Sequence, residues 1–315
     1  MRNSTGYRTA RSAGAVLLVG LAFASLVTGS LSGCISARPA IAGNPSASLH
    51  EQVVQVPARD VMLSGVLFTP EKSPLLRERR PAIVLMHGCG GMVDARGALV
   101  ARHRDWAERF ARWGFVALTL DSFAPRGLKS ICEMKERPIH PWKERTADAY
   151  AALDYLVDRS DVDPGAVFVL GWSHGGSTVM SIVRSQAPGH QSAGPHFKAA
   201  IAFYPGCTLP LSQKSYRPTV PLTILHGEAD DWTPAAPCVE LAQKLKTAGL
   251  PVQTITYANA HHGFDQPSGQ IRYLPNVYNP AAPGERGAHV GPHPQARLDA
   301  IDDVRRFVDR QLSPR

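Results

Sequence analysis

The chain has 315 residues, of which 44% are apolar and 19% are charged, and this composition argues against collagen, coiled coil and wholesale disorder. The formal net charge is +8, but residues 1–33 contain three arginines and no acidic residue. The remainder carries 31 basic and 26 acidic side chains, without a long Lys/Arg run or a basic stripe interleaved with aromatic residues. Nucleic acid is therefore not an expected partner.

The first 33 residues have the layout of an export signal. Arg2, Arg8 and Arg11 precede an uncharged stretch whose centre reads AVLLVGLAFASLV, as is typical of a secretory signal peptide. The stretch ends in Leu-Ser-Gly-Cys, which resembles the lipobox of bacterial lipoproteins. This resemblance implies cleavage before Cys34 and a lipid on that residue. A plain signal peptide and an uncleaved membrane anchor are the alternatives.

The residues after Cys34 predict where the chain is held and where its folded part begins. Ile35 rather than aspartate follows the cysteine, which in a Gram-negative host resembles the sorting signal for the outer membrane. The expected location is therefore a membrane surface facing the periplasm. Residues 34–50 combine Pro, Gly, Ser and Ala and are interpreted as a flexible tether. Residues 51–315 are expected to form a single domain.

From residue 51 onward, strand and helix patterns alternate without a linker or a repeat. Partly alternating residues at 51–57 and 61–68 predict an antiparallel hairpin. The later strands are continuous apolar runs, which are typical of a mostly parallel sheet with helices on both faces. These strands are expected at 82–86, 115–120, 166–171, 199–204, 222–227 and 252–257, and the helices at 98–113, 143–159, from about 175, 235–248 and 294–311.

Two loops, 121–142 and 263–293, are longer than plain connections and are expected to shape a site. The strongest motif is Gly-Trp-Ser-His-Gly at 171–175, directly after a predicted strand and before a predicted helix. Small residues flank the serine because a side chain there would clash with neighbouring backbone in so tight a turn. The helix N-terminus points at the hydroxyl, and this context predicts that Ser173 is a nucleophile.

A serine nucleophile needs a general base, and the base needs an orienting acid. When the nucleophile lies in such a strand–turn–helix motif, the acid and then the histidine follow it along the chain, each after a strand. The seventh expected strand leads into EADDWTP, and the eighth leads into ANAHHGF. The acid is therefore Asp230 or Asp231, and the base is His261 or His262.

Together these motifs resemble the dienelactone hydrolase family of α/β-hydrolases, over about residues 51–311. The shared features are the G-x-S-x-G turn, a G-x-x-D-x-x-T-P acid loop and an A-x-H-G-F histidine loop. The resemblance implies an α/β-hydrolase fold. It favours Asp230, which lies three residues after a glycine, and His262, which directly precedes Gly-Phe. Asp231 is then interpreted as a loop acid or helix cap, and His261 as a pocket or surface residue.

The resemblance also implies an oxyanion hole made of two backbone N–H groups. One belongs to His174, which follows the nucleophile. The other belongs to Cys89, which follows His-Gly after the strand at 82–86. The glycines around Cys89 allow the backbone to approach a substrate closely. The same glycines do not form a dinucleotide fingerprint, because the third glycine is missing at the required spacing.

Export gives the remaining cysteines a structural meaning. If Cys34 is lipidated, four cysteines are left, and an even number in an oxidising compartment favours disulfides. Their spacing alone allows three pairings. Placed on the scaffold of the resembling family, the cysteines favour the pairs Cys89–Cys132 and Cys207–Cys238 at the rim of the site. Four buried free thiols are the alternative.

The founding dienelactone hydrolases use a cysteine nucleophile and work in the cytosol, so this chain, with Ser173, is not expected to act on dienelactone. Arg126 lies in the loop that follows the strand at 115–120 and is a candidate for contacting an anionic group, or else a structural loop arginine. Trp172 and Trp232 flank the predicted nucleophile and acid, and they are candidates for lining the pocket.

The sequence as a whole predicts a serine hydrolase that cleaves carboxylic esters or lactones through an acyl-enzyme. No zinc-binding spacing of cysteine and histidine is found, and neither a metal nor an organic cofactor is expected. The expected partners are a small ester or lactone and, through the lipid on Cys34, a membrane. One alternative is a peptidase resembling prolyl oligopeptidases, although residues 35–50 are too few for a gating domain. The other is a non-catalytic binding lipoprotein, which is expected to have lost a triad member.

Overall fold

The computed structural model describes residues 48–71, 79–184, 187–189 and 194–313. The predicted leader, the lipidation at Cys34 and most of the predicted tether lie outside the described residues. The first strand begins at Leu49, so the folded part includes the last two residues of the predicted tether. Within the described ranges, no helix has the length and apolar character needed to cross a membrane.

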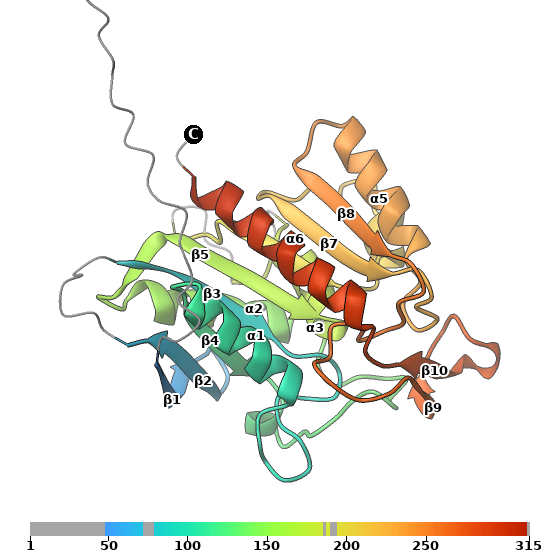
Figure 1. Cartoon of the computed structure of the whole chain (residues 1–315), viewed down its shortest axis with the longest axis horizontal. Coiled ribbons are helices and arrows are strands. Elements are labelled where there is room, and N and C mark those ends of the chain that lie inside the picture. Colours follow the sequence, from blue (N-terminus) through green and yellow to red (C-terminus); the bar gives the residue numbers. More distant parts are fainter. Residues whose placement is uncertain (1–47, 72–78, 185–186, 190–193, 314–315) are drawn as a thin grey trace, which may run out of the picture. The chain divides into compact units, whose positions relative to one another are not determined.

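An eight-stranded sheet forms the centre of the structure. Its strands are β1 (Leu49–Pro57), β2 (Met62–Pro70), β3 (Arg80–Met86), β4 (Val116–Asp121), β5 (Val162–Trp172), β6 (Ala199–Phe203), β7 (Leu222–Gly227) and β8 (Val252–Tyr257). The spatial order is β1-β2-β4-β3-β5-β6-β7-β8 (Figure 1). β1 and β2 form the predicted antiparallel hairpin, β2 pairs antiparallel with β4, and every pair from β4 to β8 is parallel. The mostly parallel sheet is therefore confirmed.

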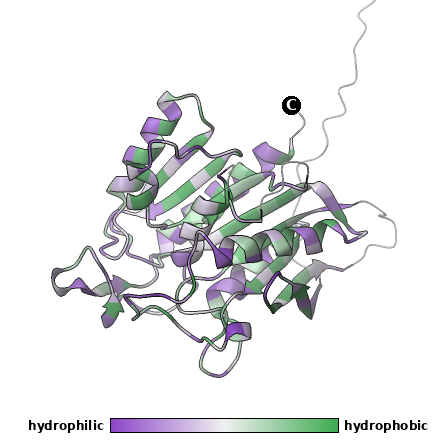
Figure 2. Cartoon of the chain, turned by 180° about the vertical axis from the view of Figure 1, so that it is seen from behind, coloured by the Kyte–Doolittle hydropathy of each residue, from purple (hydrophilic) through white to green (hydrophobic). Residues whose placement is uncertain are grey.

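Helices cover both faces of this sheet. They are α1 (Ala101–Arg112), α2 (Glu144–Val157), α3 (His174–Ile182), α5 (Ala236–Thr247) and α6 (Pro294–Leu312). Apolar side chains of α1 and α6 pack on one face, and those of α2, α3 and α5 pack on the other. Within β3, Ile83 and Leu85 belong to the first core, and Val84 and Met86 belong to the second. Burial on both faces explains why the strands are continuous apolar runs, which are also visible in Figure 2.

Several short elements were not predicted, because no apolar run or helical period marks them. A two-stranded hairpin lies inside the loop expected at 263–293. Its first strand is mostly exposed, whereas three of the five residues of its second strand are buried. The hairpin packs against the loop that follows β7, where the indole N–H of Trp232 donates to the carbonyl of Tyr278 at 2.9 Å. The added elements are α4 (Thr208–Ser212), η1 (Ala124–Arg126), β9 (Arg272–Tyr278), η2 (Pro283–Glu285) and β10 (Arg286–Val290).

Candidate active site

Ser173 occupies the turn between β5 and α3. Its φ of 53° and ψ of −115° are unusual for a residue with a side chain. The backbone N–H of Ser173 donates to the carbonyl of Phe203 at 2.9 Å, which ties the turn to the end of β6. A Cβ at Gly175 would overlap with the carbonyl oxygen of Met86, so only glycine fits two residues later. The surrounding backbone therefore holds Ser173 in a strained conformation.

Asp230 and His262 follow β7 and β8, and their side chains meet. Nδ1 of His262 lies 2.8 Å from Oδ2 of Asp230. The other carboxylate oxygen accepts the backbone N–H groups of Trp232 and Thr233 at 3.0 and 2.9 Å. Burial by itself would raise the pKa of Asp230, but the charge and hydrogen bond of His262 outweigh it and leave the pKa below its ordinary value. Asp230 is thus an ionised, fixed acceptor for the imidazole.

The serine and the histidine both contact residues at the carboxyl end of β6. Ser173 bonds to Phe203, and the ring of the next residue, Tyr204, lies 4.5 Å from the ring of His262. The hydroxyl of Thr233 lies 3.1 Å from the carbonyl of Tyr204 and 3.1 Å from Nδ1 of His262. No hydrogen bond joins the Ser173 hydroxyl to His262 among the described residues, and such bonds are often long before substrate binds.

The loop after β3 lies against the nucleophile. A Cβ placed on Gly88 would come within 3.6 Å of the Ser173 Cβ. Nε2 of the buried His87 accepts the backbone N–H of Ser122 at 3.2 Å, so the imidazole proton is on Nδ1, which donates to the carbonyl of Gly88 at 2.7 Å. Burial holds the pKa of His87 well below its ordinary value, which keeps the ring neutral.

The bond from His87 orients the predicted oxyanion donor. In a trans peptide the C=O and the following N–H point in opposite directions. Holding the Gly88 carbonyl therefore also fixes the direction of the Cys89 N–H. The second predicted donor, the N–H of His174, belongs to the first turn of α3 and so has no partner within the helix.

Two disulfides join the loops of this region, Cys89–Cys132 and Cys207–Cys238. They are the two predicted pairs. The first connects the loop after β3 to the long loop after β4, where Ile131 N–H also donates to the Cys89 carbonyl at 2.9 Å. The second connects the loop after β6 to α5. Both bridges therefore restrain segments around Ser173.

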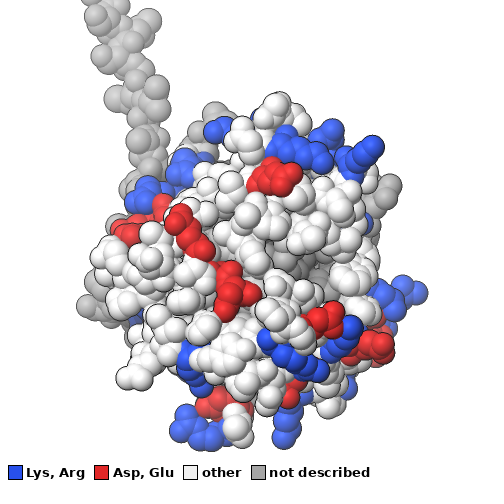
Figure 3. Space-filling model, turned by 90° about the vertical axis from the view of Figure 1, so that its right-hand side faces the viewer, with Lys and Arg blue, Asp and Glu red and all other residues white. Residues whose placement is uncertain are grey.

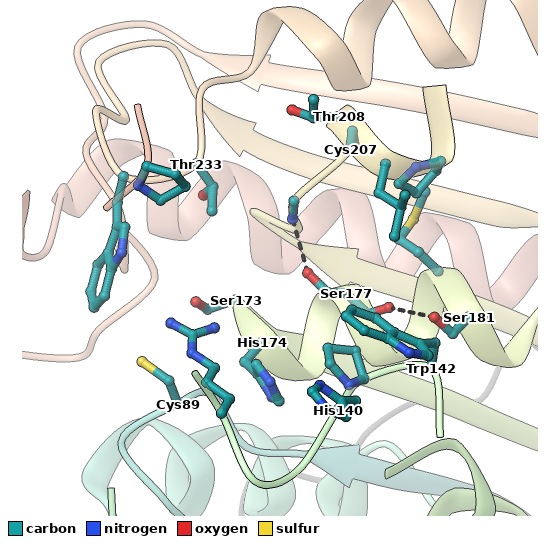
Figure 4. Close-up of a pocket in the computed structure, with 18 of the residues that line it drawn as sticks. Cys89, His140, Trp142, Ser173, His174, Ser177, Ser181, Cys207, Thr208 and Thr233 are labelled. Carbon is teal, nitrogen blue, oxygen red and sulfur yellow. Dashed lines mark hydrogen bonds between the residues drawn. The ribbon is translucent and has the colours of Figure 1, made fainter. Parts of the chain in front are cut away.

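A cavity of about 740 Å³ opens beside Ser173. One edge of the cavity carries a row of hydroxyls at helical spacing, with Ser173 at the N-cap of α3 and Ser177 and Ser181 within the helix, and Trp142 lies beside the last two (Figure 4). Gly206 N–H donates to the Ser177 hydroxyl, and the Ser181 hydroxyl donates to the Ser177 carbonyl. Most of the remaining wall surface is apolar and includes Met180, Leu209, Pro210, Tyr216, Trp232 and Tyr278, but the charged residues Lys135, Glu136, Arg137 and Arg184 also line the cavity.

The family model for the dienelactone hydrolase family matches residues 63–287. The chain belongs to the dienelactone hydrolase family. It is 27% identical over 185 residues to NocK of Nocardia uniformis subsp. tsuyamanensis, which is named as an esterase. The match covers 56% of this chain and 49% of NocK, so the chain spans about half the length of this curated relative.

Solved structures show the same fold. Esterase 2 of Thermogutta terrifontis with bound propionate is similar with a TM-score of 0.57 and 22% identity, over 88% of this chain and 98% of that one. A dienelactone hydrolase-like promiscuous phosphotriesterase from metagenomic libraries has a TM-score of 0.58 and 18% identity, over 84% and 99% of the two chains. At these identities the likeness establishes the α/β-hydrolase fold.

The structure contradicts two of the predicted substrate contacts, those of Arg126 and Trp172. Arg126 is outside the cavity, and its guanidinium donates to Asp148 at 2.8 and 2.9 Å and to Asp60 at 3.0 Å. Two carboxylates thus satisfy its charge, and it is not available to an anionic substrate. Trp172 is fully buried and its indole N–H donates to Asp265 at 2.8 Å, so it does not line the cavity. Trp232 does line it.

Sequence reasoning also missed several residues. Thr233 contacts both members of the acid–histidine pair, and the T-P of the acid loop was the available signal. Arg137 and Arg184 line the cavity without an ion pair among the described residues, and the long loop that carries Arg137 had no readable pattern. Burial lowers the pKa of Arg137. Asp231, the alternative to Asp230 as the acid, forms an ion pair with the exposed His289 at 2.7 Å and not with His262.

The surface around the site is electrostatically mixed. On the face shown in Figure 3, basic side chains lie mainly toward the edge, whereas a band of acidic side chains runs into the middle of the face beside a hollow lined by uncharged residues. No group of three or more His, Cys, Asp or Glu side chains in the described part of the chain is arranged to hold a metal ion.

Proposed function

We propose that the chain is a serine hydrolase that cleaves carboxylic esters or lactones. One observation carries the proposal. Ser173, in a strained turn at the N-terminus of α3, opens into a cavity, and the Asp230–His262 pair lies at the same edge of the sheet. Membership of the dienelactone hydrolase family and an esterase among the relatives support hydrolysis of an ester.

In the proposed mechanism, the Ser173 hydroxyl attacks the ester carbonyl while Nε2 of His262 takes its proton. Asp230 holds the proton on Nδ1, which leaves Nε2 as the acceptor, and it stabilises the imidazolium that forms. The N–H groups of Cys89 and His174 stabilise the oxyanion. His262 then protonates the departing alcohol, and a water molecule, activated by the same histidine, releases the acid from the acyl-enzyme.

The cavity suggests the kind of ester. Its volume of about 740 Å³ and its mainly apolar wall suit an ester with a sizeable apolar acyl or alcohol group. We therefore propose that intermediate acyl chains are cleaved faster than acetate. A series of p-nitrophenyl esters from acetate to dodecanoate, with Ser173→Ala as the control, tests the reaction and the size preference. Loss of turnover in the variant supports the proposal, and unchanged turnover in it refutes it.

We also propose that Cys34 is lipidated and holds the enzyme on a membrane facing the periplasm. The Leu-Ser-Gly-Cys sequence supports this proposal, and two disulfides accord with an oxidising compartment. Expression in a Gram-negative host with labelled palmitate tests it. The full chain is expected to carry the label in the membrane fraction, whereas Cys34→Ala is expected to lack it.

A further inference from the structure

Asp265 is a fully buried carboxylate, three residues after His262, that accepts hydrogen bonds from three separate elements. One oxygen accepts the indole N–H of Trp106 on α1 at 2.9 Å and that of Trp172 on β5 at 2.8 Å. The other oxygen accepts the hydroxyl of Tyr204, which follows β6, at 2.6 Å. None of these groups takes part in the proposed chemistry.

A guanidinium completes this cluster. Arg102 donates to the Tyr204 hydroxyl at 3.0 Å and lies 4.0 Å from the Asp265 carboxylate. Burial, opposed in part by the charge of Arg102, holds the pKa of Tyr204 well above its ordinary value, so the phenol stays protonated and donates a hydrogen bond to Asp265. The carboxylate is thus satisfied on both oxygens, as a buried carboxylate must be if it is not to destabilise the fold.

The partners of Asp265 are the neighbours of the catalytic residues. Trp172 directly precedes Ser173, and the ring of Tyr204 lies 4.5 Å from the ring of His262. Ser173 and Tyr204 are also two residues with side chains that have positive φ, 53° and 36°. Such strained conformations persist only where the surroundings enforce them.

We propose that Asp265 is a positioning residue for the serine hydrolase reaction. By holding Trp172 and Tyr204 from within the histidine loop, it sets the distance and angle between the Ser173 hydroxyl and His262. This inference rests on the proposed function. A displacement of about 1 Å at a reacting group can lower a rate by about 100-fold, so a small relaxation of the cluster is expected to reach kcat.

The chain contains a matched tyrosine–aspartate pair that lacks this connection. The hydroxyl of the buried Tyr257 donates to Asp303 on α6 at 2.9 Å. Neither of these two residues lines the cavity, and the Tyr257 ring packs on Phe264 at 4.9 Å rather than on His262. Tyr204→Phe and Tyr257→Phe therefore remove the same kind of bond, and only the first bond belongs to the Asp265 cluster.

The test compares Asp265→Asn, Tyr204→Phe and Tyr257→Phe with the wild type, each as the full chain in detergent. The measurements are kcat and KM for p-nitrophenyl butyrate, the fraction of sites that react with a serine-directed phosphonate, and the melting temperature. We expect kcat per reactive site to fall about 100-fold in Asp265→Asn and about 10-fold in Tyr204→Phe, with KM within about threefold. Tyr257→Phe is expected to keep kcat within about twofold while its melting temperature falls.

A purely structural role predicts a different outcome, in which both tyrosine variants lose stability and neither loses kcat. That result, or wild-type kcat in folded Asp265→Asn, overturns the inference. If Asp265→Asn does not fold, Tyr204→Phe and Trp172→Phe each remove a single donor and carry the same expectation. If the wild type cleaves no ester, the proposed function and the inference both fail. If the wild type is active, the variants test the inference by itself.

Discussion

Oδ2 of Asp230 lies 2.8 Å from Nδ1 of His262, and the hydroxyl of Thr233 lies 3.1 Å from both atoms. Three side chains from two loops therefore define one tautomer of the imidazole. The carboxylate accepts a hydrogen bond from the Nδ1–H group, which leaves Nε2 without a proton. In the proposed mechanism this Nε2 takes the proton of Ser173. This arrangement leads to distinct expectations for its two supporting residues.

Asp230→Asn is expected to lower kcat by about 10³- to 10⁴-fold, because an amide no longer enforces the reactive tautomer. Thr233→Val is expected to lower it by about 10-fold, since the carboxylate remains. Steady-state kinetics on p-nitrophenyl butyrate measure both effects, with Asp231→Asn as the matched neighbour. A larger loss of kcat in Asp231→Asn than in Asp230→Asn would show that Asp231, and not Asp230, is the acid that orients the histidine.

Arg126 is expected to matter for stability and not for substrate recognition. Arg126→Met removes the ion pair of Asp148, whose side chain is 1% exposed, and leaves only the charge of the buried Arg145 to act on it. Breaking such a buried pair costs about 3–5 kcal/mol of unfolding free energy. Urea unfolding measures that loss. KM values for a neutral ester and for one with an acidic acyl group should not diverge in the folded variant, and a selective rise for the acidic ester would restore Arg126 to the site.

Acid should destabilise the fold from about pH 6.5 downward. Burial holds the pKa of His87, His103, His174 and His226 below the ordinary value, and that of His103 falls to about 3. These histidines stay neutral in the folded chain but take up protons in the unfolded chain once the pH is below their ordinary pKa of about 6.5. Above about pH 6.5 these histidines do not change the unfolding free energy. Below that pH the unfolding free energy decreases by about 1.4 kcal/mol per pH unit for each histidine.

Thermal unfolding between pH 8 and pH 5 measures this dependence. His103→Phe, which keeps a ring beside Trp172, is expected to show a shallower decrease because one proton fewer is taken up. A melting temperature that does not change over this range would contradict the assignment of neutral buried histidines.

The Cys89–Cys132 bridge is expected to affect both catalysis and stability. Its removal by Cys132→Ser with Cys89→Ala opens a loop with a sequence separation of 43, which costs about 3–4 kcal/mol. It also frees the backbone that carries the proposed oxyanion donor at residue 89, so kcat is expected to fall. The matched double variant of Cys207 and Cys238 should lose comparable stability with a smaller loss of kcat. Equal kcat losses in the two variants would argue against a specific role for the Cys89 loop.

The site residues that were predicted from the sequence share one property. Their positions are fixed by the backbone of the neighbouring strand. Ser173, Asp230 and His262 each follow a recognisable apolar strand, and the carboxyl ends of parallel strands meet at one edge of a sheet. Recognition of family motifs then chose between Asp230 and Asp231. The disulfide pairs followed from the same scaffold.

The residues that sequence could not place depend on partners far along the chain. Arg126 is 66 residues from Asp60, and Trp172 is 93 residues from Asp265. Nothing in the local pattern indicates that these partners exist, so both side chains looked free to meet a substrate. The β9–β10 hairpin was missed for a related reason, because half of its strand residues are exposed and neither strand contains a continuous apolar run.

The central claim is that Ser173 is the nucleophile, and covalent labelling tests it most directly. The protein is treated with a serine-directed phosphonate, digested, and mapped by mass spectrometry while residual ester hydrolysis is followed. The account predicts one label per chain, on Ser173, appearing in step with the loss of activity and absent from Ser173→Ala. Activity lost without a label on Ser173, or ester hydrolysis retained in Ser173→Ala, would contradict it.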